Sequence, residues 1–345
     1  MKLSTFKLTV IAAAVGTSTL SGATEAPESI WDSVGINLGG GAEYESKRIG
    51  DYLQAGGTTT FNRQTTAQLG QLTLNLPQNS IVQYTLSKTS AYETYSSNSN
   101  KLDTDSYQNV LYAGRSFPVG SGGLTGGLYY TGTFIAGTEK AYAYGTNYSS
   151  DQKSSDNRIK SSLNYTSPDG KFGTYAYGEI FATDLDNNVW WSTSKYKTST
   201  PGSAFVIQPS IKLGALTLQA SAYYASSLTH TDLGSTRVGE NNFKEQYLEP
   251  KVTYRIEDGG SLWASVRSTD QETLMTGGSW YAEGSRHRYF TNVKKVAIGY
   301  QQSVGSWDLS AQVRRSWQTD QTSAYDGDKK ETVDDLVNFY ATYKF

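Results

Sequence analysis

Few residues in the sequence have the chemistry for a catalytic reaction. There are two histidines, His230 and His287, and no cysteine, which excludes thiol catalysis, cysteine-ligated metals and disulfides. His230 stands two residues before Asp232 in "HTD", so the two could form the His–Asp pair of a hydrolase, but no serine can be identified in register with them. Both histidines fall in polar stretches that we expect to be long loops. Solvated loop residues explain them better, and we predict that the protein is not an enzyme and uses no cofactor.

A short acidic motif, "DLDNN" from Asp184 to Asn188, has side-chain oxygens at alternate positions, as at the start of a calcium-binding loop. The glycine and the closing bidentate glutamate of such a loop are missing, because Val189 and Lys195 occupy those places. A loop-bound cation stays an alternative. A solvated loop is the simpler interpretation, and we predict no metal site.

More informative are charged and aromatic residues that recur at every second position of short segments. A sugar ring has an apolar CH face and a rim of hydroxyls, so aromatic surfaces beside carboxylates, amides and guanidinium groups suit a polyhydroxyl solute. The 30 basic and 32 acidic residues nearly cancel, which favours a neutral solute and argues against a nucleic-acid partner. The charged candidates are Glu43, Glu45, Arg158, Lys160, Glu179, Glu249, Lys251, Arg255, Arg267, Asp308 and Arg314. The aromatic candidates are Tyr175, Tyr177, Tyr223, Tyr247, Trp263 and Tyr340.

The elements that position these residues are segments of about ten residues in which apolar and polar side chains alternate. In "LTLQASAYYA", from Leu216 to Ala225, the leucines share one face with alanines while Thr217 and Gln219 lie on the other. A period of two over this length predicts a half-buried β-strand. The pattern predicts fourteen strands, at about 35–48, 64–76, 80–93, 104–117, 124–137, 157–167, 171–184, 202–213, 216–228, 243–256, 261–272, 289–303, 306–318 and 333–345.

The connections between these strands alternate between short turns and long polar stretches. Short turns such as "PDG" (Pro168 to Gly170) carry the residues that tight hairpins need, whereas others, such as "SWQTDQTSAYDGDKKE", have ten or more polar residues. A soluble sandwich has no reason to alternate in this way. The sequence therefore predicts an all-β fold, an antiparallel up-and-down transmembrane β-barrel of about 14 strands, with short periplasmic turns and long extracellular loops. Trp307 and Trp317, near the two ends of one strand, suit the aromatic girdles at the membrane boundaries.

In such a barrel the candidate charges must face a wet interior or one another, because lipid exposure of Arg or Lys costs about 2–4 kcal/mol each. We expect the charged and aromatic candidates to line the pore. One alternative is a salt-bridge network that plugs a narrow barrel, but the interior of a barrel with fourteen strands is too wide to be filled by side chains alone. Another is that some rings belong to the girdles and the strand register is wrong by one residue.

The N-terminus is predicted to be a secretory signal peptide over residues 1–23. Lys2 and Lys7 form the positive region, and the apolar run from Leu8 to Gly16 is about half of the roughly 20 residues that a spanning helix needs. An exported protein without cysteine fits an oxidising envelope compartment. We therefore expect a signal peptide (1–23), a mature N-terminal segment (24–33) and a barrel domain (34–345) in the bacterial outer membrane.

Both ends of the predicted mature chain have distinctive features. The segment 24–33 lacks the strand period and holds Pro27, Ile30 and Trp31; it could be a periplasmic tail or fold into the lumen. The chain ends on "FYATYKF", in which every second residue back from Phe345 is aromatic or small and apolar. This ending predicts a last strand held against the first, with Phe345 in the periplasmic girdle, and it resembles the signal that barrel-assembly machinery recognises.

With its signal peptide, fourteen strands, sugar-suited lumen and terminal "FYATYKF", the whole chain resembles the monomeric outer-membrane sugar channels, most of all the cyclodextrin (cyclomaltodextrin) porins of enteric bacteria. The resemblance implies passive uptake of cyclic or linear gluco-oligosaccharides by a monomer. It also implies that the mature N-terminal segment, with Pro27, Ile30 and Trp31, is a displaceable pore constriction. The trimeric general porins are a poorer match, because their acidic, glycine-rich constriction-loop motif is absent.

The expected function is an outer-membrane channel for passive uptake of neutral oligosaccharides, with cyclodextrins or linear maltodextrins as the expected substrates. Its expected partners are the oligosaccharide, outer-membrane lipid and lipopolysaccharide, and the barrel-assembly machinery during biogenesis. A channel for acidic oligosaccharides of the oligogalacturonate type is one alternative, although the acidic positions Glu43, Glu45 and Glu179 oppose it. A barrel that serves as an adhesin or receptor scaffold is another.

Overall fold

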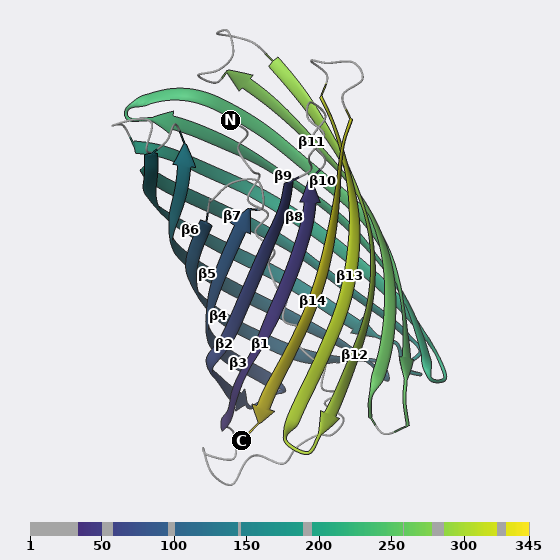
Figure 1. Ribbon diagram of the computed structural model, residues 1–345. Coiled ribbons are helices and arrows are strands. Elements are labelled where there is room, and N and C mark those ends of the chain that lie inside the picture. The colour runs from purple at the N-terminus through teal and green to yellow at the C-terminus, as the bar shows by residue number, and fades with distance from the viewer. Residues whose placement is uncertain are drawn as a thin grey trace.

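The protein is a closed antiparallel β-barrel, and the fold class predicted from the sequence is confirmed (Figure 1). The computed structural model describes residues 34–49, 58–95, 101–143, 146–188, 195–257, 259–277, 286–322 and 329–344. Each strand pairs with its neighbours in chain order, and β1 pairs with β14 to close the ring. Closure gives every strand two partners, so no sheet edge is left open. Among the residues described, no helix is long and apolar enough to cross a membrane.

The fourteen strands are β1 (Val34–Ile49), β2 (Thr58–Leu76), β3 (Ser80–Tyr95), β4 (Lys101–Val119), β5 (Gly122–Ala143), β6 (Thr146–Thr166), β7 (Phe172–Asn188), β8 (Lys195–Leu213), β9 (Leu216–Leu233), β10 (Thr236–Arg255), β11 (Ser261–Gly277), β12 (Arg286–Val304), β13 (Trp307–Thr322) and β14 (Lys329–Lys344).

Alternate residues of each strand face opposite sides of the barrel wall, because successive side chains of a strand point to opposite faces. Large apolar side chains such as Ile180, Leu248 and Val313 are exposed on the outer face. Polar and charged side chains between them are buried or half-buried on the inner face. An apolar outside and a polar inside are what a barrel in a membrane requires.

Tight hairpins join the strands at one end of the barrel, as predicted. The turns after β8 and β12 begin with Gly214 (φ 62°) and Gly305 (φ 58°), a left-handed backbone conformation that glycine adopts at no steric cost. In the turn after β2, Gln78 and Asn79 take the same conformation, at φ 60° and 54°. Two consecutive left-handed residues form the turn that matches the twist of paired strands.

At the other end, several strands are longer than the sequence predicted. β9 continues to Leu233 and β10 begins at Thr236, so the connection expected to be a long loop is a turn through Gly234. The stretch 137–155, also interpreted as a loop, belongs largely to β5 and β6. These extensions are polar on both faces, so they lose the apolar alternation by which a strand is recognised, while their backbone pairing continues.

The same extensions correct the placement of two motifs. His230 lies in β9 and His287 in β12, not in long loops, and Asp184 to Asn188 form the end of β7. The sequence interpretation of these residues as loop residues was wrong, because polarity alone cannot separate a loop from a strand that extends beyond a membrane.

A bulge in β2 changes which residues face inward. The register of β2 shifts at Gln68/Gly70 against β3, and the register with β1 shifts at Asn37/Gly39. Even-numbered residues such as Gln68 are half-buried before the bulge, and odd-numbered ones such as Gln71 are half-buried after it. One extra residue therefore keeps polar amides inside along the whole strand.

Candidate functional site

The inner face of the barrel carries the charged and aromatic residues that the sequence predicted. All seventeen candidates lie at inner-face positions, and all except Arg255 are buried or half-buried. Arg255 is exposed at the end of β10, next to a turn. They are Glu43, Glu45, Arg158, Lys160, Tyr175, Tyr177, Glu179, Tyr223, Tyr247, Glu249, Lys251, Arg255, Trp263, Arg267, Asp308, Arg314 and Tyr340.

An ion-pair cluster lies on β6 and β7. Arg158 donates from Nε to Asp156 Oδ2 at 2.7 Å and from Nη1 to Glu179 Oε1 at 2.9 Å. Asp156 is only 2% exposed and also accepts a hydrogen bond of 3.0 Å from the Thr183 hydroxyl. The Arg158 guanidinium lies 4.9 Å from the centre of the Phe181 ring. The arginine is thus held on three sides, and both carboxylates are compensated.

Lys160, two residues along β6, lies among tyrosines. Its Nζ is 4.0 Å from the centre of the Tyr129 ring and 5.1 Å from that of Tyr177. Tyr129 stacks on Tyr112 with ring centres 4.4 Å apart, and Tyr177 contacts Tyr175 at 5.9 Å. Four tyrosines and one ammonium group therefore form a continuous surface on β4 to β7.

A second cluster lies on β10 and β11. Arg267 donates from Nε to Glu249 Oε2 at 2.7 Å, and its guanidinium lies 4.1 Å from the centre of the Tyr247 ring. Tyr247 stacks in turn on Tyr223 of β9, with ring centres 4.6 Å apart and planes 14° from parallel. Lys251 Nζ is 4.4 Å from the centre of the Trp263 ring.

Several luminal rings lie against the wall over glycines of the neighbouring strand. A Cβ atom at Gly299 of β12 would overlap the Trp263 ring, and one at Gly202 of β8 would overlap Phe181. The absence of a side chain at these glycines lets each ring lie close to the backbone of the neighbouring strand.

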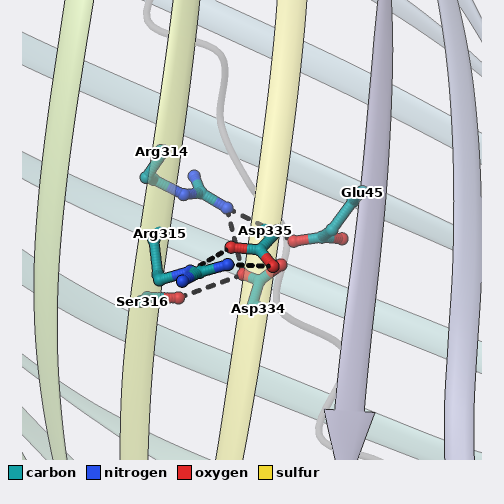
Figure 2. A network of polar contacts seen from close by, with 6 residues as sticks. All are labelled: Glu45, Arg314, Arg315, Ser316, Asp334 and Asp335. Carbon is teal, nitrogen blue, oxygen red and sulfur yellow. Dashed lines mark hydrogen bonds and ion pairs between the residues drawn. The ribbon is translucent and has the colours of Figure 1, made fainter.

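A third charged cluster joins the two ends of the barrel sequence (Figure 2). Arg314 Nη2 of β13 donates to Glu45 Oε1 of β1 at 3.3 Å and to Asp334 Oδ2 of β14 at 3.2 Å. The Ser316 hydroxyl also bonds Asp334 at 3.2 Å, and Glu43 lies buried beside this group. Three carboxylates thus share one guanidinium, and the cluster is acidic.

The next residue, Arg315, faces the opposite side of the wall (Figure 2). Its Nη2 donates to Asp335 Oδ2 at 2.9 Å, and both side chains lie on the outer face with Trp317. Consecutive arginines therefore have different surroundings: Arg314 is part of the lumen lining, and Arg315 lies on the outer face.

Strands β2 to β5 line the lumen differently. At the inner-face positions whose side chains the structure describes, they carry no charge. Instead, amides and hydroxyls bond across the strands: Gln71 donates to Thr85 at 3.2 Å, and Gln83 donates to Thr73 at 3.1 Å. This neutral wall was not predicted as a site, although the alternation of Gln and Thr with apolar residues was visible in the sequence.

Sequence reasoning also missed Tyr112, Tyr129, Phe181 and Asp156. Tyr129 is followed by Tyr130, so the pattern alone does not say which of the two faces inward. The structure places Tyr130 outside, at 42% exposure, and Tyr129 inside. A strand-by-strand count from Leu128, which is apolar and faces out, would have identified it.

At the periplasmic end, Asp308 is part of the rim. It accepts a hydrogen bond of 2.7 Å from the Ser303 hydroxyl and forms an ion pair with Lys344, which joins β13 to β14 beside the start of β1. Tyr340, on the same strand, spans the seam: its hydroxyl donates to Gln68 Oε1 of β2 at 3.2 Å, across Gly41 of β1. These two residues hold the closure of the barrel.

His230 and Asp232, which the sequence analysis considered and rejected as a hydrolase pair, belong to a polar cluster at the ends of β9 and β10. Arg237 Nε donates to Asp232 Oδ1 at 3.2 Å, and its Nη1 is 2.9 Å from His230 Nδ1. Over the described part of the chain, no group of three or more His, Cys, Asp or Glu residues could hold a metal ion. The predicted constriction residues Pro27, Ile30 and Trp31, and the terminal Phe345, lie outside the described residues, as do the signal peptide and the segment 24–33.

Comparison with known proteins agrees with this architecture. The sequence profile of one protein family, described as "CymA: Putative cyclodextrin porin", matches residues 7–345. The chain belongs to the CymA family. The protein is accordingly a porin-like barrel channel of the outer membrane, in agreement with the resemblance found in the sequence.

Two solved structures similar to this CymA-family chain are a channel and a transporter for hydrocarbons. The "TodX monoaromatic hydrocarbon channel deltaS2 mutant" superposes with a TM-score of 0.53 at 10% identity, covering 92% of this chain and 90% of that one. The Pseudomonas putida toluene transporter TodX gives a TM-score of 0.50 at 8% identity with the same coverage. At these identities the likeness shows the barrel fold alone. No curated protein matches the chain.

Proposed function

We propose that this channel takes up neutral oligosaccharides by passive diffusion, with cyclodextrins or linear maltodextrins as its substrates. The observation that carries the proposal is the set of aromatic rings on the inner wall, which pack on one another and over glycines, together with the hydroxyls and amides of β2 to β5. Aromatic surface can contact the CH face of a sugar, and amides exchange hydrogen bonds with sugar hydroxyls. The family description points to the same substrate class.

The balance of luminal charges also supports a neutral substrate. Arg158, Arg267 and Arg314 are each paired with carboxylates, so they present little uncompensated charge to a solute. Weak contacts spread along a wall allow a solute to enter and also to leave, which conduction requires.

The alternative substrate is an acidic oligosaccharide. It is favoured by one feature, the two lysines Lys160 and Lys251, whose ammonium groups lie on aromatic rings. The acidic cluster of Glu43, Glu45 and Asp334 on β1 and β14 would repel the same solute.

The N-terminal part of the chain belongs to the same proposal. After removal of residues 1–23 at export, the segment 24–33 would enter the lumen with Pro27, Ile30 and Trp31 and act as a displaceable constriction of a monomeric channel. Deleting residues 24–32 is then expected to raise the open-pore current in planar bilayers, and an unchanged current would remove the constriction.

Planar-bilayer recording tests the transport function directly. The protein should give conductance steps that maltohexaose or α-cyclodextrin blocks in a dose-dependent way. Block by oligogalacturonate alone would favour the acidic alternative. A barrel that inserts but gives no conductance would contradict both and leave an adhesin or receptor scaffold.

A further inference from the structure

Two strand pairs in the lumen repeat the same set of interactions. On β6 and β7, Arg158 pairs with Glu179 and lies on Phe181, while Lys160 lies on Tyr129. On β10 and β11, Arg267 pairs with Glu249 and lies on Tyr247, while Lys251 lies on Trp263. We call the two sets station 1 and station 2. Each has an Arg–Glu pair, a ring beneath the arginine and a lysine on a separate ring.

In each station the arginine takes the carboxylate that the lysine could have used. Glu179 is the direct cross-strand neighbour of Lys160 in the β6–β7 register, yet it bonds Arg158. Glu249 lies on the same face as Lys251, two residues earlier, yet it bonds Arg267. Among the described residues, neither lysine has an ion pair or a hydrogen-bond acceptor, although both are half-buried.

An ammonium group in this situation has donors to spare. It carries three N–H donors, and the face of a ring attracts the charge without supplying an oxygen acceptor. Its donors are therefore free for the oxygens of water or of a solute. Aromatic surface around the ammonium group can contact the CH groups of a sugar, while the sugar hydroxyl oxygens accept hydrogen bonds from the ammonium.

The two stations are separated along the barrel wall by a distance that one oligosaccharide can span. Lys160 and Lys251 stand on β6 and β10, four strands apart in the barrel. Neighbouring strands lie about 4.8 Å apart, so the strands are separated by about 19 Å along the wall. The wall is curved and both side chains reach inward, which shortens this gap. Rings of the two strand groups, such as Tyr177 of β7 and Tyr247 of β10, are near enough to interact electrostatically. The solute length that first reaches both ammonium groups is therefore the quantity that a comparison of short and long oligosaccharides measures.

We propose that Lys160 and Lys251 are equivalent hydrogen-bond donors that hold one oligosaccharide at two points during passage. This rests on the proposed function, because it assigns the specificity of the same lumen. Binding at two linked points is stronger than at either one, since the second contact forms within the same complex. The stations therefore select for solute length, beyond selecting for sugar chemistry.

The test compares current block by maltohexaose and by maltose in planar bilayers for the wild type, Lys160→Met and Lys251→Met. Each single variant should weaken maltohexaose block about tenfold, as expected for loss of one charged hydrogen bond. Maltose block should weaken by no more than about twofold, because the other station remains for it. Lys160→Gln, which keeps a donor without the charge, should retain most of the maltohexaose block.

Lys212→Met, at an exposed position near the end of β8, is the matched control and should leave both sugars unaffected. Open-pore conductance equal to the wild type shows that each variant folds. If maltohexaose blocks the wild type and both lysine variants equally, the role of the two lysines is overturned, whereas the proposed function stays intact. Equal weakening for the two sugars, or a change in ion selectivity alone, also overturns this role. A wild-type channel that neither sugar blocks overturns the proposed function, and the stations with it.

Discussion

The neutral wall of β2 to β5 differs from the charged arc, the name given to the three clusters on β6–β7, β10–β11 and β13–β14–β1, in how inward-facing polar groups are satisfied. In the wall, Gln71 and Gln83 bond threonines across the strands, and each amide is cheap to remove from bulk water. In the arc, Arg158 and Arg267 need a carboxylate and a ring each, because an uncompensated charge in a half-buried site is costly. The neutral wall should therefore tolerate single substitutions, whereas the charged arc should depend on each charged residue and its partner.

The largest difference between the two regions is expected from Arg158→Met in the arc. It leaves Asp156, at 2% exposure, and Glu179 without their cation, so the free energy of unfolding should fall by about 2–3 kcal/mol. Urea unfolding in lipid vesicles measures the loss.

Arg315→Met is the matched control for that measurement. The Arg315–Asp335 pair lies on the outer face, and its loss leaves no carboxylate unpaired inside the barrel, so Arg315→Met should lower the free energy of unfolding less than Arg158→Met does. Equal losses for the two arginines would show that the arc does not depend on charge compensation inside the barrel.

A smaller effect is expected on sugar affinity when an arc ring is removed. Trp263→Ala deletes the ring over Gly299, and loss of one aromatic contact of about 0.5–1.5 kcal/mol should weaken maltohexaose block roughly two- to tenfold. Gln83→Ala in the neutral wall should change the block by less than twofold. If Gln83→Ala weakened the block more than Trp263→Ala, the sugar would bind mainly to the amides of the neutral wall, and the contrast between wall and arc would be reversed.

Sequence alternation predicted the faces of these residues but not their partners. It placed Glu43, Lys160 and Trp263 inside, because a strand with an apolar outer face has only one register that keeps charges out of lipid. Which carboxylate bonds which arginine depends on the stagger between strands, and this is not encoded in the period of any one strand. The clusters around Arg158 and Arg267 therefore became visible only in the folded barrel.

Local exceptions to the pattern limited the prediction in the same way. The extra residue in β2 near Leu69 reverses the inner parity, and a uniform alternation assigns the residues on one side of it to the wrong face. The polar ends of β9 and β10 were interpreted as a loop, because they lie beyond the apolar zone where alternation has contrast.

In the neutral wall itself, Gln71→Leu is expected to cost about 1 kcal/mol. It removes a bond of 2.7 Å from Asn37 Nδ2 and one of 3.2 Å to the Thr85 hydroxyl, but leaves no charge uncompensated. The same urea titration measures the loss, and Gln71→Glu is the sharper companion, since it introduces a charge into the wall. A loss from Gln71→Leu as large as that from Arg158→Met would contradict the tolerance assigned to the wall.

The smallest effect is expected for an exposed carboxylate in the turn between β6 and β7, the strands that carry the Arg158 cluster. Asp169, in the turn between β6 and β7, accepts hydrogen bonds from the Ser167 hydroxyl at 2.6 Å and the Lys171 backbone N–H at 3.1 Å, and these lower the pKa of its carboxyl. A lowered pKa in the folded state stabilises the fold above the unfolded pKa of about 3.9, and this contribution is lost as the pH falls through the folded value. The wild type should therefore be slightly more stable than Asp169→Ala. This difference in the free energy of unfolding should be constant from pH 6 to 8 and should shrink below about pH 4. Urea midpoints across this range measure it. A difference that grew on acidification would mean that the protonated carboxyl, and not the carboxylate, stabilises the turn.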